Sequence, residues 1–98
     1  MLISTTNIND KYEVIDVIFN LHTVQPKGFL GSGGMDMEEG FNGAKAALIE
    51  KARARGGDAV IGCQFDVRVA VAGMADKQVL EIFCWGTVVK ISKQIPGA

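Results

Sequence analysis

Three long stretches of this chain have the pattern of β-strands: two alternate apolar and polar residues, as strands that bury one face do, and the last is apolar on both faces. The stretches are Tyr12–Leu21, Gly57–Val71 and Gln78–Ser92. A shorter β-prone segment, Leu2–Thr6, precedes them and has the composition of a short edge strand. We therefore predict one short strand and three long ones.

The faces of the three long strands differ in composition. The first strand carries two sets of residues, Ile15, Val17, Phe19 and Leu21 on one face and Val14, Asp16, Ile18 and Asn20 on the other. The second alternates apolar Ile61, Cys63, Phe65, Val67, Val69 and Val71 with Gly62, Gln64, Asp66 and Arg68. The last strand is apolar on both faces, with Leu80, Ile82, Cys84 and Val88 on one and Val79, Phe83, Trp85, Val89 and Ile91 on the other. Such a strand needs cover on both sides.

From Met35 the apolar spacing changes to that of a helix. One stripe repeats every three or four residues and consists of Met37, Phe41, Ala44, Leu48 and Ala52. Asp36, with Glu39 three residues later, is typical of an N-cap with a capping box. The pair Gly56-Gly57 is typical of a helix end. We predict a single helix between the first and second long strands.

Two segments are expected to be irregular. His22–Gly34 is predicted to be a loop, because Pro26 cannot donate to a strand ladder and several glycines follow it. Ala72–Lys77 is predicted to be a tight turn, in which Gly73 supplies a positive φ. The second and third long strands are therefore expected to form a hairpin.

These elements predict an α+β domain with two layers. A helix between two strands favours a parallel relation of those strands, whereas a hairpin is antiparallel. Both conditions are met if the last strand lies between the other two, which gives a β-α-β-β subunit with an antiparallel sheet of order 1-3-2. One helix covers only one face, so the opposite face, with Phe83 and Trp85, is predicted to be a subunit interface.

Composition narrows the class of protein. With 98 residues, the chain predicts a single domain over 1–98. The formal charge of -1 argues against nucleic acid as a partner, since non-specific binding needs clustered cations. We see no membrane-spanning run and no signal pattern, so no membrane partner is expected. Two cysteines are too few for a disulfide framework, and we expect a cytoplasmic protein with reduced thiols.

Cys63 and Cys84 are the first candidates for chemistry. A tight hairpin places them near each other on one face, and thiolates bind thiophilic metals such as zinc or copper. The alternative is that both are small buried apolar residues. His22 is the only histidine, and it is either a third metal ligand, with Met35 or Met37, or a solvated loop residue. No acid–base pair or activated nucleophile is evident, so we predict no enzymatic activity and no cofactor other than such a metal.

Two further patterns have a functional and a structural interpretation. Gly31–Gly34 before a helix resembles a phosphate-binding loop, but it lacks the lysine of that motif and acidic residues follow. We interpret it as a connector. Asp66 and Arg68 lie two apart on the polar face of their strand. They either form an ion pair between subunits, or line a small site, or form a solvated pair that contributes little.

Three segments carry a resemblance to a known family: Ile3-Ser4-Thr5-Thr6, Gly57-Asp58-Ala59-Val60-Ile61-Gly62 and Gly86-Thr87-Val88-Val89-Lys90. In their order and spacing the chain resembles the YbjQ-like family of small bacterial proteins, whose label is heavy-metal binding. The resemblance implies a dodecin-like subunit, a ring-shaped homopentamer and no assigned activity. The chain departs from the family at residues 25–34, where its segment is shorter, so a function of that segment is in doubt here.

The sequence thus leads to two functional hypotheses. The first is a non-enzymatic, homo-oligomeric binding or assembly module whose main partner is itself. The alternative is a thiophilic metal-binding protein that uses Cys63 and Cys84, with His22 as a further ligand.

Overall fold

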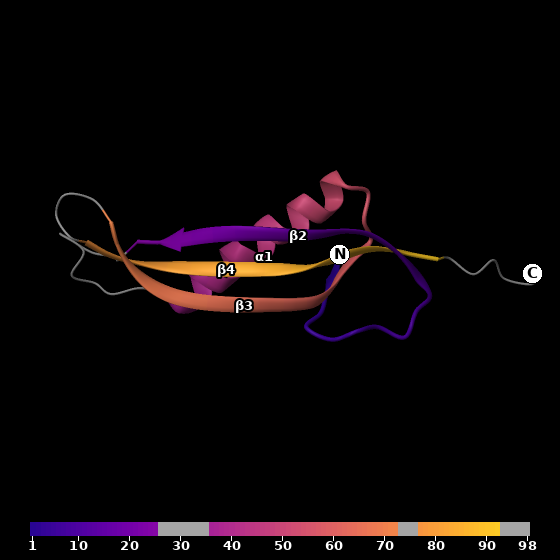
Figure 1. Cartoon of the computed structure of the whole chain (residues 1–98), viewed down its shortest axis with the longest axis horizontal. Helices are drawn as coiled ribbons and strands as arrows, with labels where there is room; N and C mark the ends of the chain where they lie inside the picture. The colour runs from indigo at the N-terminus through magenta and orange to yellow at the C-terminus, as the bar shows by residue number, and fades with distance from the viewer. Residues whose placement is uncertain (26–35, 73–76, 93–98) are drawn as a thin grey trace, which may run out of the picture.

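The structure, a computed structural model, describes residues 1–25, 36–72 and 77–92. In chain order the elements are β1 (Leu2–Ile3), β2 (Tyr12–Val24), α1 (Met37–Ala54), β3 (Ala59–Ala72) and β4 (Lys77–Ile91). Figure 1 shows α1 lying across one face of a sheet made by the long strands. The predicted positive φ at Gly73 and the predicted connector Gly31–Gly34 lie outside the described residues.

The sheet has four strands in the order β1-β3-β4-β2. The short β1 is parallel to β3, and β4 runs antiparallel to both of its neighbours. The expected α+β class is therefore confirmed, and the sheet is mixed rather than purely antiparallel because β1 adds a parallel edge. The last strand, β4, lies between β3 and β2 and pairs with both along most of its length. The strand that is apolar on both faces is therefore also paired on both edges.

Helix α1 begins and ends where its capping residues predict. The Asp36 side chain accepts a hydrogen bond from the Glu39 backbone N–H at 3.0 Å, which satisfies a donor that the first turn leaves free. Gly56 then adopts a φ of +75°, a conformation that ends helices. Met37 differs from the expected buried stripe: it is the first residue of the helix and is 42% exposed. Within the described residues, no helix has the length and apolarity needed to cross a bilayer.

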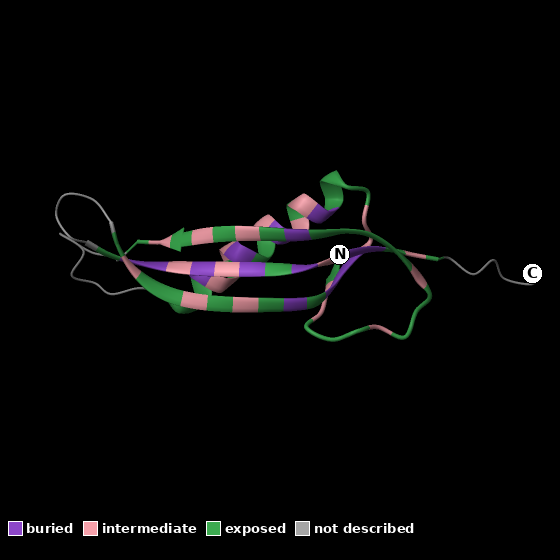
Figure 2. Cartoon of the chain, in the orientation of Figure 1, coloured by how far each residue is buried: buried purple, intermediate pink, exposed green. Residues whose placement is uncertain are grey.

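The main core lies between α1 and the face of the sheet that it covers, called here the covered face. Its buried residues are Ile18, Ala44, Leu48, Ala52, Val60, Cys63, Leu80, Ile82, Cys84 and Val88. Figure 2 shows buried residues alternating along β4 and recurring on α1. None of the described polar or charged residues is buried, so this core is stabilised mainly by the burial of apolar side chains.

A smaller cluster lies on the opposite face of the sheet, called here the open face. Ala59, Ile61 and Val89 are buried there, and Ile8 and Tyr12 pack against them. The segment between β1 and β2 therefore covers one end of the open face. The remainder of that face has no covering element among the described residues.

Two register shifts change which side chains share a face. Between Ile61 and Gln64, β3 has one residue more than β4, and Gly62 adopts a φ of +60° there. The expected unbroken alternation from Ile61 to Val71 is therefore wrong at its start: Ile61 packs in the open-face cluster, whereas Cys63 packs in the main core. The second shift lies in β2 between Val14 and Asp16. It makes Ile15 the extra residue and moves Val14 to the open face, where its partner Val89 lies.

Strand β2 is longer than predicted. His22, Thr23 and Val24 were expected in a loop but pair with Ile82, Glu81 and Leu80 of β4. The physical reason is that Pro26 limits the ladder only from its own position onward, and β4 offers partners up to that point.

Candidate functional site

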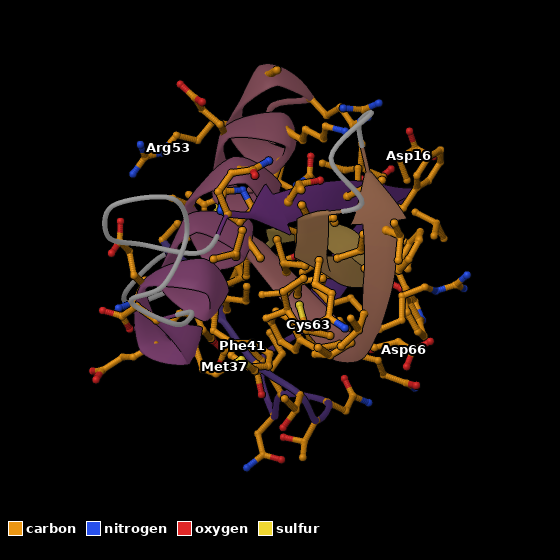
Figure 3. The ribbon with its side chains drawn as sticks, turned by 90° about the vertical axis from the view of Figure 1, so that its left-hand side faces the viewer. Asp16, Met37, Phe41, Arg53, Cys63 and Asp66 are labelled. Atoms are coloured by element: carbon orange, nitrogen blue, oxygen red, sulfur yellow. The ribbon has the colours of Figure 1, made fainter. Side chains whose placement is uncertain are left out.

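The two cysteines meet under α1, as the hairpin predicted. Cys63 is 2% exposed and Cys84 is 1% exposed, and both thiols are free. The Cys84 Sγ lies 3.6 Å from the Asn20 carbonyl oxygen and 3.7 Å from that of Ala44 in α1, so the thiol donates to backbone. Figure 3 shows Cys63 on the side of β3 that faces the helix, opposite to Asp66.

Burial controls the chemistry of both thiols. Burial, and then the neighbouring Cys84, raise the pKa of Cys63 to about 11. Burial likewise raises the pKa of Cys84. With pKa values raised in this way, both thiols are protonated at neutral pH. They are unreactive in that form, because the thiolate is the form of cysteine that binds metals and acts as a nucleophile.

His22 does not join the cysteines. Its ring packs against Gly43 of α1, where an added Cβ would lie 2.6 Å from Nε2. His22 belongs to β2 and Cys63 to β3, with β4 between these strands. In residues 1–25, 36–72 and 77–92, no three His, Cys, Asp or Glu side chains come together to hold a metal ion. The arrangement within one chain therefore does not fit a structural zinc site, which needs four ligands.

A row of exposed apolar side chains follows the edge strand β2 on the open face. We call it the edge stripe: Val14 (58% exposed), Val17 (60%), Phe19 (74%) and Leu21 (47%). Trp85, 37% exposed, is the direct cross-strand partner of Phe19 on β4. The sequence had singled out Phe83 and Trp85 on this face, and the structure places the most exposed residues beside them, on the neighbouring strand.

A second exposed apolar pair lies on β3, beyond the two residues that pair with β1, and on the other face of the sheet. Val69 and Val71 of β3 are 59% and 63% exposed, and we call them the tip stripe. Val69 pairs with Leu80 of the main core, so it lies on the covered face, beyond the helix. The edge stripe and the tip stripe are therefore different surfaces on opposite sides of the sheet.

Two basic side chains of α1 reach the edge strand. Lys51 Nζ donates to the Phe19 carbonyl oxygen at 2.8 Å and lies 5.7 Å from the centre of the Phe19 ring. Arg55 Nε donates to Asp16 at 2.9 Å, and this bond holds the pKa of that carboxyl below its ordinary value. Sequence reasoning had assigned Lys51 and Arg55 no contact with the sheet. Their spacing of four, which places both on one side of α1, was the available signal.

A hollow of about 400 Å³ lies next to the edge stripe. Phe19, Phe83 and Trp85 line it, together with the charged side chains Asp66 and Arg68. Arg68 lies with its guanidinium carbon 4.7 Å from the centre of the Phe83 ring, a cation–π arrangement. The sequence offered an ion pair between subunits or a small site for Asp66 and Arg68, and both side chains line this hollow.

Comparison with known proteins adds a curated relative and a solved structure. A UPF0145 protein of Methanococcus maripaludis is 31% identical over 94 residues, which cover 96% of this chain and 79% of that protein. A crystal structure of a protein of unknown function from Pediococcus pentosaceus, assigned to the DUF74 family, aligns with a TM-score of 0.75 and 25% identity. That alignment covers 94% of this chain and 98% of the other.

The family model that matches the chain covers residues 28–92 and bears the description "Putative heavy-metal-binding". The match includes the helix, both strands of the hairpin and both cysteines. On this match and on the curated relative, the chain belongs to the YbjQ family.

Proposed function

We propose that this protein is a non-enzymatic module that assembles with copies of itself into a ring, of five subunits on the family resemblance. The observation that carries the proposal is the pair of exposed apolar stripes at opposite edges of the sheet. Single exposed apolar residues are ordinary, but a contiguous row such as Val14, Val17, Phe19 and Leu21 is typical of an association surface.

The positions of the stripes favour a head-to-tail interface. The edge stripe lies on the open face of β2, and the tip stripe lies on the covered face of β3. A surface that contacts a different surface on the next copy forms a heterologous interface, which closes into a ring when the rotation permits. Contact between two edge stripes would instead form a dimer and leave Val69 and Val71 in water.

Charged side chains along the edge of β2 favour a subunit contact made by side chains over one made by pairing with a strand of the next copy. Lys51 donates a hydrogen bond to the Phe19 carbonyl oxygen, and Arg55 donates one to the side chain of Asp16, three residues earlier on β2. Charged side chains at a sheet edge oppose pairing with another strand. The edge stripe, which projects from the face rather than from the edge, stays open to a neighbouring copy.

The proposal includes a cytoplasmic location and no catalytic role. The two free cysteines are buried and protonated, which suits a reducing compartment and gives no nucleophile. The proposed activity therefore resides in assembly and in what the assembled surface binds.

Multi-angle light scattering at micromolar concentration tests the proposal. We expect a species of about five times the 10.5 kDa chain mass for the unaltered protein and a monomer for Phe19→Asp. Met37→Asp is the matched control, since it places the same charge at an exposed apolar residue outside both stripes. A 10.5 kDa species for the unaltered protein contradicts the proposal.

Thiophilic metal binding is the alternative function. The neighbouring thiols of Cys63 and Cys84 and the family description favour it, whereas their burial and raised pKa oppose it. Elemental analysis of untagged protein, followed by copper(I) titration of Cys63→Ala/Cys84→Ala, tests it. Stoichiometric metal that the double variant loses would establish this function; equal binding by both proteins would exclude these residues from it.

A further inference from the structure

The hollow beside the edge stripe combines aromatic rings and cations that come from four elements. Phe19 comes from β2, Phe83 and Trp85 from β4, Arg68 from β3 and Lys51 from α1. Its volume of about 400 Å³ falls within the range of small-molecule sites, about 300–1,000 Å³. Its aromatic and charged side chains lie on the open face or reach its edge, and Cys84 of β4 is also among the lining residues.

Aromatic side chains give the hollow a floor suited to a flat molecule. Phe19 and Trp85 are direct cross-strand partners, and Phe83 lies two residues before Trp85 on the same face. Phe19 and Trp85 remain 74% and 37% exposed, so ring surface is available for contact. Aromatic rings bind other planar rings by offset stacking or edge-to-face contact.

Positive charge outnumbers negative charge in the lining. The Arg68 guanidinium lies over Phe83, and a stacked guanidinium keeps its N–H edge free to bind an acid group in a bidentate manner. Lys51 uses one donor on the Phe19 carbonyl oxygen, and an ammonium group has three. Asp66 is the carboxylate of the lining, and it disfavours a second anion placed next to it.

We infer that this hollow binds a planar aromatic molecule that carries an acidic group, with its ring on Phe19 and Trp85 and its acid on Arg68. A single chain forms the hollow, so the site does not require the assembly proposed above. In an assembled ring, Phe19 and Leu21 belong both to the hollow and to the edge stripe, and ligand binding is linked to association.

Isothermal titration calorimetry with a matched pair of probes tests the inference. The probes are 2-naphthoate and its neutral amide, 2-naphthamide, which share one ring system and differ in charge. We expect the naphthoate to bind about tenfold more tightly, because only its carboxylate forms a charge-assisted pair with Arg68.

Three variants test which side chains cause the difference in affinity between the two probes. Arg68→Gln is expected to abolish the advantage of naphthoate, while Arg53→Gln, the same change at an exposed arginine on α1, leaves it intact. Asp66→Asn is expected to tighten naphthoate binding by about twofold to threefold, because it removes the neighbouring negative charge. Circular dichroism checks that each variant is folded.

The result that overturns the inference is equal binding of acid and amide, binding that Arg68→Gln leaves unchanged, or no binding of either probe. The titrations are repeated with Val71→Asp, which alters the tip stripe and leaves the hollow intact. Light scattering on the same samples gives the oligomeric state. Light scattering therefore reports a failure of self-assembly, and calorimetry independently reports a failure of ligand binding.

Discussion

The covered and open faces of β4 present similar apolar residues to different surroundings. On the covered face, Ile82, Cys84 and Val88 are at most 1% exposed, because α1 packs over them. On the open face, Trp85 is 37% exposed and its partner Phe19 is 74% exposed. The same strand thus contributes to a fully buried core on one face and to a partly exposed apolar surface on the other.

This difference shows that an apolar pattern in the sequence predicts burial. It does not show whether the residues that bury it belong to the same chain or to a neighbouring one. The covered face is completed within the chain by Ala44, Leu48 and Ala52 of the helix. Among the described residues, the open face is covered at the end where Ile8 and Tyr12 pack against Ala59, Ile61 and Val89. Val79, near the start of β4, is also buried, whereas Phe19 and Trp85 between these two ends are exposed. Substitutions on the two faces should therefore act on different quantities: folding stability on the covered face, and association on the open one.

The largest effect on stability is expected for Leu48→Ala. Leu48 lies on the sheet-facing side of α1 and is fully buried, and truncation of such a side chain costs about 2–5 kcal/mol through lost burial and the resulting cavity. Urea denaturation measures the loss, and Ile49→Ala, at the next and only partly buried position, is the control with a smaller expected loss. Equal losses for the two variants would contradict the assignment of the covered face.

The next effect is alkaline destabilisation through Cys63. Its folded pKa of about 11 lies above its ordinary value of 9.0, so the folded state holds the thiol proton where the unfolded state has lost it. Stability should fall by about 2–3 kcal/mol as the pH rises from about 9 toward 11. Denaturation midpoints across this range measure the fall. Cys63→Ala should flatten the curve, and an unchanged slope in that variant would show that other groups cause it.

The smallest effect is expected at the exposed pair of Arg55 and Asp16. Arg55→Gln should raise the pKa of Asp16 toward its ordinary value, because the side-chain hydrogen bond that lowers it is lost. The stability that this pair contributes is present above the ordinary pKa and is lost as the pH falls through the folded value. NMR titration of the Asp16 carboxyl measures the shift. Both side chains are about half exposed, so we expect little change in the unfolding midpoint at neutral pH.

Much of the fold was predictable because its signals are local. Alternation located the long strands, and Asp36 and Gly56 located the ends of the helix. The bulges were not predictable: one extra residue reverses every face assignment before it, and only Gly62 marks one of the two positions. The extension of β2 to Val24 was missed because it depends on partners offered by β4.

The candidate site was predictable only in part. The proximity of Cys63 and Cys84 follows from a hairpin, but their raised pKa depends on how deeply α1 buries them. The contact of Lys51 with Phe19 depends on where the helix crosses the sheet, and no periodicity encodes that crossing. The same holds for the edge stripe, since a residue's place on an edge strand is a property of the whole sheet.

A mixing experiment tests the central claim, head-to-tail assembly of two different stripes, most directly. Phe19→Asp removes the edge stripe and keeps the tip stripe, whereas Val71→Asp does the reverse. We expect each variant alone to be a 10.5 kDa monomer in light scattering, and an equimolar mixture to form a two-chain species through the one intact pair of stripes. A Val71→Asp variant that assembles like the unaltered protein, or a mixture that stays monomeric, would contradict the account.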